Sequence, residues 1–218
     1  MKLITYQSSR GERLGALSRA GRVLDILDMA QARQSAHCGA FASMLSLLRA
    51  GEGALEALRE VVESADDGQG AALEEVQLLS PLPLPEQIRD FANYELHVQQ
   101  ALRSSMRLRA SAASDPEKEL ERLQASGMFA IPPVWYERPL YYKCNRFSVV
   151  GHGADIQWPH FAQRLDYEVE LAVVIGRRVK NASVEEAMDA VFGYTIFNDF
   201  SARDTQAQET AFRMGPAK

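Results

Sequence analysis

The stretch LDYEVELAVVIG, residues 165–176, decides how this chain folds. Side chains two residues apart in a strand point to the same side of a sheet. One side of this stretch is therefore entirely apolar: Val169, Leu171, Val173 and Ile175. Glu168 and Glu170 project together on the opposite side. The pattern predicts a strand that is buried on at least one side and begins with two acids.

Acids are rare in apolar strands, because a buried charge without a partner is costly. A bound cation is one partner that satisfies several carboxylates at once. Taken alone, Glu168 and Glu170 fit equally well a pair of metal ligands and two incidental acids at an exposed strand end. The pair by itself leaves both interpretations open.

Asp199 ends VFGYTIFND, residues 191–199, the next strongly apolar run. An acid between a strand and a helix is either a functional group or an N-cap, and Ser201–Asp204 resembles a helix start. Read alone, Asp199 fits the N-cap better. A neighbouring strand that carries Glu168 and Glu170 favours the ligand interpretation.

Asp90 and Asp204 are further candidate acids, so the candidate ligands are all oxygen donors. Such donors suit hard cations, which predicts Mg²⁺, or alternatively Mn²⁺ or Ca²⁺. Cys38 and Cys144 show no metal-type spacing and are read as reduced thiols of a cytoplasmic protein. His97 alone indicates no more than an ordinary surface or core histidine.

The 218 residues are 46% hydrophobic and 24% charged, which is typical of a globular protein. The net charge of -5 argues against nucleic acid as a partner. The first residues lack the apolar core of a signal peptide, and no apolar run is long enough to span a membrane.

The proline-rich stretch SPLPLPE, residues 80–86, predicts a stiff linker between two domains. Residues 1–79 are predicted to form a small α+β domain, and residues 87–218 a catalytic domain. Strands are expected at 2–7, 13–18, 22–27, 76–79, 148–151 and 191–198, and helices at 40–50, 53–64, 95–109, 116–126 and 184–190.

The two segments 165–176 and 192–206 (FGYTIFNDFSARDTQ) together resemble the fumarylacetoacetate hydrolase family. The segments DFANYELH, 90–97, and PLYYKCNRFSVVGHG, 139–153, are similar to its catalytic and substrate-contacting stretches. The resemblance implies an α+β fold in which a mixed, β-rich catalytic domain of open β-roll type follows the N-terminal domain. Because family members continue past the Gly215–Lys218 segment, the C-terminal part of this domain is expected to be missing here.

The resemblance also implies roles for single residues. Asp90, Glu168, Glu170 and Asp199 would ligate a divalent metal, and His97 would be the base that activates water. Tyr142 and Gln206 would contact the substrate. Arg203 and Asp204 are expected to be structural, with Asp204 as a cap at the third position of a helix. The acid that orients His97 would come from elsewhere in the chain.

The implied activity is hydrolysis of a carbon–carbon bond in a β-diketo acid of the fumarylacetoacetate or acylpyruvate type. Two alternatives remain: an isomerase or decarboxylase that uses the same site, and a truncated, non-catalytic member that binds metal. The stretch 98–130 is more polar and longer than the family pattern, and a lid that alters specificity is one interpretation of it. The resemblance further suggests a homodimer.

Overall fold

The computed structural model describes residues 1–211, and its internal contacts divide it into two units. One unit comprises Met1–Glu86 together with the chain from Asn145 onward, and the other comprises Gln87–Cys144. The segment Gly215–Lys218 lies outside the described residues. The predicted boundaries of 1–79, 80–86 and 87–218 stay a prediction.

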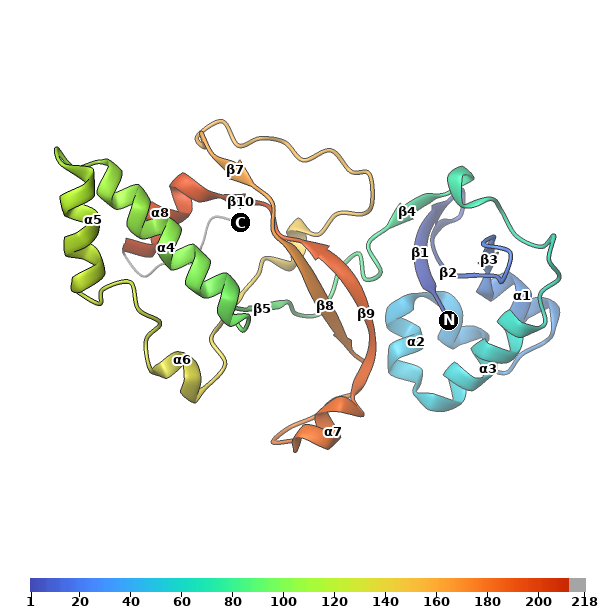
Figure 1. Cartoon of the computed structure of the whole chain (residues 1–218). Helices are drawn as coiled ribbons and strands as arrows, with labels where there is room; N and C mark the ends of the chain where they lie inside the picture. Colours follow the sequence, from blue (N-terminus) through green and yellow to red (C-terminus); the bar gives the residue numbers. More distant parts are fainter. Residues whose placement is uncertain (212–218) are drawn as a thin grey trace. The chain divides into compact units, whose positions relative to one another are not determined.

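The N-terminal part of the first unit is built on an antiparallel sheet (Figure 1). Its strands are β1 (Leu3–Ser8), β2 (Gly11–Leu17), β3 (Val23–Asp25) and β4 (Gln77–Leu79), in the order β3-β2-β1-β4. Gly11, at φ +97°, begins β2 directly after the turn, where a left-handed conformation favours glycine. The four strands predicted for this part are present.

Three helices and two short 3₁₀ turns follow these strands or lie between them. They are α1 (Ile26–Ala32), η1 (Cys38–Ala42), α2 (Met44–Ala50), α3 (Glu52–Glu63) and η2 (Leu73–Glu75). The predicted strand 22–27 was too long, because the Asp25 side chain accepts a hydrogen bond from the Asp28 N–H and starts α1. The predicted helix 40–50 is a 3₁₀ turn followed by a shorter α-helix.

One apolar core holds this part together. Its fully buried large side chains come from β2, β3 and the helices: Leu14, Leu24, Ile26, Phe41, Leu47 and Leu58. Phe192, at the start of β9, packs against the same core from the C-terminal part of the unit. Burial of this apolar surface is the main favourable term for the unit.

The second unit, Gln87–Cys144, combines a two-stranded ladder with helices. The elements are β5 (Arg89–Phe91), α4 (Glu95–Ser111), α5 (Pro116–Ala125), α6 (Val134–Glu137) and β6 (Tyr141–Lys143). The predicted helices at 95–109 and 116–126 are confirmed, and Asp115 caps α5 through the Lys118 N–H. The core of this unit is small, formed by Met106, Ala110 and Leu123 with Leu120 and Phe129.

The C-terminal part of the first unit is organised around a hairpin of two long strands (Figure 1). Its elements are η3 (Arg146–Ser148), β7 (Leu165–Asp166), β8 (Val169–Ile175), α7 (Val184–Met188), β9 (Val191–Asn198), β10 (Ser201–Ala202) and α8 (Arg203–Ala211). A capping box between Ser183 and Glu186 starts α7, as predicted. The predicted strand 148–151 is wrong: the Asn145 side chain caps the turn η3 instead.

The sequence predicts a strand that is buried on at least one side, and in this chain the apolar side of the hairpin is exposed. Leu171 lies opposite Ile196, and Val173 lies opposite Tyr194. Leu171 is 72% exposed and Ile196 is 78% exposed. The side that carries Glu170 is the half-buried one. Burial therefore follows the acids, and the apolar side is left to solvent in the single chain.

The fold is of the α+β class, as the sequence predicts. Among the described helices, none combines the length and apolar composition that crossing a membrane requires.

Candidate metal centre

The pairing of β8 with β9 brings three acids to one end of the hairpin. Val169 lies opposite Asn198, and the Asp199 N–H donates to the Glu168 carbonyl oxygen at 2.8 Å. Glu168 and Asp199 are therefore directly across from each other, one step beyond the ladder. Glu170 projects to the same side as Glu168, because it is two residues further along the strand.

Asp199 is not a helix cap. Between it and α8 lies the short strand β10, which pairs with β7 through Ser201 opposite Asp166. The helix begins two residues later than the sequence suggests, at Arg203. Asp199 is only 7% exposed. The structure thus removes the N-cap alternative and leaves a buried carboxylate at a strand end.

Asp90 occupies the middle of β5, directly across from Tyr142 on β6. The Tyr142 hydroxyl donates a 2.6 Å hydrogen bond to Oδ2 of Asp90. Two residues that the sequence predicts for different roles, metal ligand and substrate contact, are therefore linked to each other. The short bond to a charged acceptor holds one Asp90 oxygen in place.

The four predicted ligands form an acidic cluster. Asp90, Glu168, Glu170 and Asp199 each offer one carboxylate oxygen, and these oxygens all lie within 4.8 Å of one another. At an effective dielectric constant of 20, two unit charges 4.8 Å apart repel by roughly 3.5 kcal/mol, and closer pairs repel more. A cation among the oxygens would offset this repulsion, because it attracts all four carboxylates.

The donor set fits a hard divalent cation. All four groups are carboxylates, three of them half-buried and Asp199 buried. Oxygen-only ligation is typical of Mg²⁺, Mn²⁺ and Ca²⁺, whereas Zn²⁺ sites mostly use Cys and His. The cluster is consistent with the divalent-metal site that the sequence predicts.

Arg203 adds a positive charge to this cluster. Its Nη1 lies 2.5 Å from Oε1 of Glu168, and its Nε lies 3.1 Å from Oδ2 of Asp166. Burial opposes the charged form, but the hydrogen bond and charge of Glu168 outweigh it and raise the pKa of Arg203. Arg203 was expected to be structural only, and its contact with a predicted ligand was missed. The sequence feature that could have indicated this contact is a single arginine four residues after Asp199.

Gln206 and Asp204 are held by neighbours on different sides of α8. The Gln206 Oε1 accepts from Nη1 of Arg203 at 3.2 Å. Asp204 is the second helical residue, not the third, and its Oδ2 accepts from the Gln163 N–H at 2.7 Å. This backbone hydrogen bond is the main cause that lowers the pKa of Asp204. Asp204 thus anchors the loop that precedes β7.

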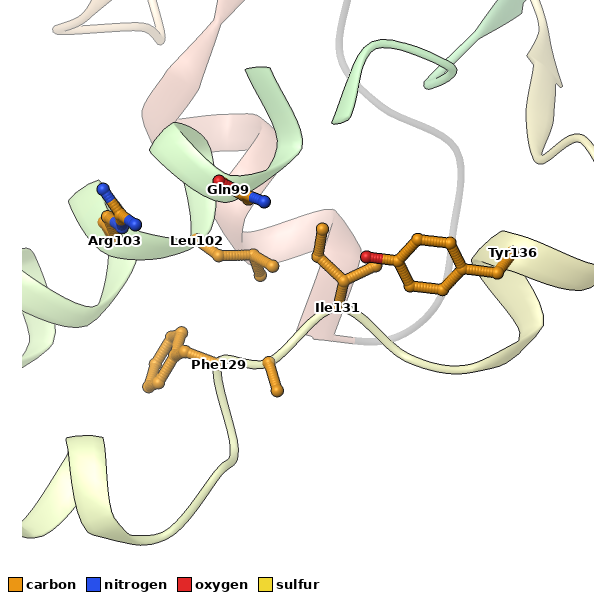
Figure 2. Close-up of a pocket in the computed structure, with 7 residues that line it drawn as sticks. Gln99, Leu102, Arg103, Phe129, Ile131 and Tyr136 are labelled. Atoms are coloured by element: carbon orange, nitrogen blue, oxygen red, sulfur yellow. The ribbon is translucent and has the colours of Figure 1, made fainter. Parts of the chain in front are cut away.

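His97 lies in the first turn of α4, is exposed, and is not a member of the acidic cluster. A hollow of about 400 Å³ in the same unit is lined by Gln99, Leu102 and Arg103 of α4 and by Phe129, Ala130, Ile131 and Tyr136 (Figure 2). At 100° per residue, the three α4 positions lie on the opposite side of the helix from His97. The hollow is therefore separate from the predicted base.

Comparison with known proteins defines the class to which this fold and cluster belong. Residues 86–218 match the family described as fumarylacetoacetate (FAA) hydrolase, C-terminal. The chain belongs to the fumarylacetoacetate hydrolase family. The resemblance inferred from the sequence is thereby confirmed.

Two curated relatives and one solved structure illustrate the range of the family. The chain is 32% identical to maleylpyruvate hydrolase of Aquipseudomonas alcaligenes over 164 residues, 74% of this chain and 50% of the relative. It is 47% identical to oxaloacetate tautomerase YisK of Bacillus subtilis over 81 residues, 36% of this chain and 27% of the relative. The fold matches fumarylacetoacetate hydrolase from Exiguobacterium antarcticum with a TM-score of 0.57 at 22% identity, covering 96% of this chain and 59% of that one.

The matched segments thus span half or less of the curated relatives' own length. The relatives include both a hydrolase and a tautomerase. Family membership therefore identifies an enzyme superfamily but not one reaction, and the acidic cluster of this chain is its candidate metal site. The choice between these reactions rests on the chemistry of individual side chains.

Proposed function

We propose that this chain carries the metal-binding part of a hydrolase that cleaves a carbon–carbon bond in a β-diketo acid. The observation that carries the proposal is the cluster of four carboxylates, Asp90, Glu168, Glu170 and Asp199, in a member of this family. We further propose that the segment from residue 87 contributes to a β-rich catalytic domain of open β-roll type.

The cluster's four oxygens would hold Mg²⁺, or Mn²⁺ or Ca²⁺ in its place. When bound, such an ion polarises carbonyl oxygens and stabilises negative charge on them. Neighbouring carbonyl and carboxylate oxygens of an acylpyruvate or fumarylacetoacetate are suited to this, because they can chelate one ion. A cation held by the four acids would thus be the substrate's point of attachment.

His97 is proposed as the general base. It would take a proton from water, and the resulting hydroxide would add to a carbonyl carbon of the substrate. The carbon–carbon bond then breaks, its electron pair stays on the leaving carbon, and that carbon takes up a proton. An imidazole suits this task because its ordinary pKa lies near neutrality.

Tyr142 and Gln206 are proposed to contact the substrate. The hydroxyl of Tyr142 is bonded to Asp90, and the amide of Gln206 is bonded to Arg203. Both side chains are therefore linked to the acidic cluster directly or through one residue. A substrate attached to the cluster would lie within reach of groups held in this way.

A tautomerase or isomerase is the second candidate, favoured by the 47% identity to an oxaloacetate tautomerase over 81 residues. This reaction moves a proton between carbon and oxygen and breaks no carbon–carbon bond. A decarboxylase, and a metal-binding member without turnover, are the remaining alternatives.

One experiment separates these candidates. The purified chain with Mg²⁺ is given an acylpyruvate, fumarylacetoacetate or oxaloacetate, while enol absorbance and products are followed by spectroscopy and chromatography. A hydrolase consumes the enol and yields two carbon fragments, whereas a tautomerase changes the absorbance of oxaloacetate without new products. Carbon dioxide release indicates a decarboxylase. Mg²⁺ binding with no change in any substrate would contradict both catalytic proposals.

The proposed partners are the diketo acid and a second copy of this chain, with neither nucleic acid nor membrane involved. The exposed apolar side of the β8–β9 hairpin supports the homodimer, because large apolar patches are uncommon on monomers. A cytoplasmic location remains a prediction.

A further inference from the structure

We infer that Arg203 is a positioning residue for the metal centre: its guanidinium orients Glu168 for the cation and fixes which end of the Gln206 amide is directed toward Arg203. The inference rests on the proposed metal site and assigns a role to a residue that neither the sequence pattern nor the family match specifies.

The first observation is the geometry of Arg203. One guanidinium nitrogen, Nη1, contacts both Glu168 Oε1 at 2.5 Å and Gln206 Oε1 at 3.2 Å. The Nε of the same group contacts Asp166 at 3.1 Å. A planar guanidinium that bonds three side chains from two segments holds them in a fixed relation.

The second observation is where the pair between Arg203 and Glu168 lies. The Glu168 side chain is 13% exposed and that of Arg203 is 31% exposed, whereas Asp166 is 51% exposed. A charge pair shielded from water is screened less than one at the surface. The Glu168 contact is therefore the stronger of the two, and the Asp166 contact supports it from outside.

A carboxylate has two oxygens, and Arg203 contacts Oε1 of Glu168. A side chain held at one oxygen keeps its rotamer, which reduces the ordering required when a cation binds the carboxylate. Partners of metal-ligating carboxylates typically change metal affinity by roughly 10- to 100-fold when they are removed. Arg203 occupies that position relative to Glu168.

The contact with Gln206 fixes the orientation of an amide. An arginine only donates hydrogen bonds, so the amide group facing it must be the oxygen. The amide nitrogen of Gln206 is then turned away from Arg203. A substrate oxygen is an acceptor and requires such a donor, so Arg203 would also determine what Gln206 offers to the substrate.

The alternative is that the positive charge of Arg203 simply opposes a cation. Like charges near one site repel, and removal of Arg203 would then strengthen Mg²⁺ binding. The two roles predict opposite signs for the same measurement, which makes the inference testable without any turnover.

The test is isothermal titration of the purified chain with Mg²⁺ for the wild type, Arg203→Met and Arg203→Lys. We expect the Mg²⁺ Kd to rise roughly 10-fold or more in Arg203→Met, and less in Arg203→Lys, which keeps the charge but not the forked geometry. Arg177→Met removes an exposed arginine whose closest acid, Asp189, is 4.0 Å away, and should leave the Kd unchanged.

Circular dichroism and the thermal midpoint without Mg²⁺ show whether Arg203→Met is folded. If it unfolds, the single variants Asp166→Asn and Arg203→Lys are compared with the wild type instead, because Arg203→Lys keeps the positive charge beside Glu168. Tighter or unchanged Mg²⁺ binding in folded Arg203 variants overturns the inference. Wild-type protein that binds no Mg²⁺ instead overturns the proposed metal site itself.

Where turnover is measurable, a second readout follows Gln206. Arg203→Lys and Gln206→Glu should both raise the KM for the diketo acid, whereas only the Arg203 variant should weaken Mg²⁺ binding. A KM for Arg203→Lys equal to that of the wild type at saturating Mg²⁺ would overturn the role of Arg203 in orienting the amide.

Discussion

The backbone N–H of Asp199 donates a 2.8 Å hydrogen bond to the carbonyl oxygen of Glu168. This single bond continues the β8–β9 ladder by one residue and places a buried acid directly across from a half-buried one. Because strand pairing determines the distance between opposite residues, the spacing of these two carboxylates does not depend on flexible side chains alone. The candidate metal centre is thus built on the rigid end of a hairpin.

The first prediction concerns Glu170. Glu170→Gln keeps the shape of the side chain but removes one of four charges from the cluster, so the Mg²⁺ Kd should rise at least about 10-fold, or ~1.4 kcal/mol. Isothermal titration measures it. Glu185→Gln, an exposed glutamate on α7, is the matched control and should bind Mg²⁺ like the wild type. An unchanged Kd for Glu170→Gln would remove Glu170 from the ligand set.

Mg²⁺ should also stabilise the folded chain. A ligand that binds only the native state at 100 times its Kd adds about 2.7 kcal/mol to the free energy of unfolding. Thermal or urea unfolding with and without Mg²⁺ measures this, and EDTA should reverse the gain. The double variant Glu168→Gln with Asp199→Asn should show no gain. Equal stabilisation of this variant would mean that Mg²⁺ binds elsewhere.

Replacement of the proposed base should separate turnover from metal binding. His97→Asn should lower kcat for the diketo acid by about 10²- to 10⁴-fold, the usual contribution of a general base, and leave the Mg²⁺ Kd as it is. His97 is exposed and outside the acidic cluster, so the fold should be retained. His152→Asn, at another exposed histidine, is the control. Activity equal to that of the wild type would refute the assignment.

Stability at low pH should depend on Asp25. Burial alone would raise the pKa of Asp25, but hydrogen bonds from Arg13 and Tyr6 outweigh it and lower the pKa. A lowered native pKa stabilises the fold at pH values above the unfolded value of about 3.9, and this stabilisation is lost as pH falls through the native pKa. Urea unfolding should show stability declining below about pH 4.

Asp25→Asn should reduce the free energy of unfolding at pH 7 by about 1–3 kcal/mol. The reason is that a neutral amide accepts weaker hydrogen bonds from Arg13 and from the Asp28 N–H at the start of α1. It should also flatten the decline at acid pH. Asp67→Asn, in an exposed loop, should do neither. A pH profile of Asp25→Asn that parallels that of the wild type would show that other groups govern acid stability.

The exposed side of the hairpin gives a prediction on assembly. Leu171→Lys with Ile196→Lys should abolish self-association measured by light scattering, because two charges would enter a contact between apolar surfaces. Unfolding free energy should change by no more than about 0.5 kcal/mol, since both side chains are exposed. Val184→Lys, 84% exposed on α7, is the control. A monomeric wild type would contradict the homodimer.

Alternation of acids and apolar residues predicted strand β8 of the hairpin, and a strongly apolar run predicted β9. Proline and caps located the helices 116–125 and 184–188 within two residues. Predictions based on periodicity were wrong where side chains form hydrogen bonds with the nearby backbone. Asp25 ended a predicted strand by capping α1, and Asn145 formed a turn where a strand was expected.

The candidate site was predictable only in part. The family resemblance named Asp90, Glu168, Glu170 and Asp199, and these four acids do cluster. It did not reveal Arg203, because an arginine near acids in sequence is as often a surface residue as a partner. The contact of Arg203 with Glu168 depends on β10 pairing with β7, which no local pattern encodes.

By itself, the sequence determined which residues alternate along each strand, since side-chain direction follows from backbone geometry at every position. It therefore determined that Glu168 and Glu170 share a side, and that Leu171 and Val173 share the other. Only the tertiary structure decided which side is covered, and which acid lies across from which. Burial and register depend on residues distant in the chain, because they arise when separate strands pair and pack.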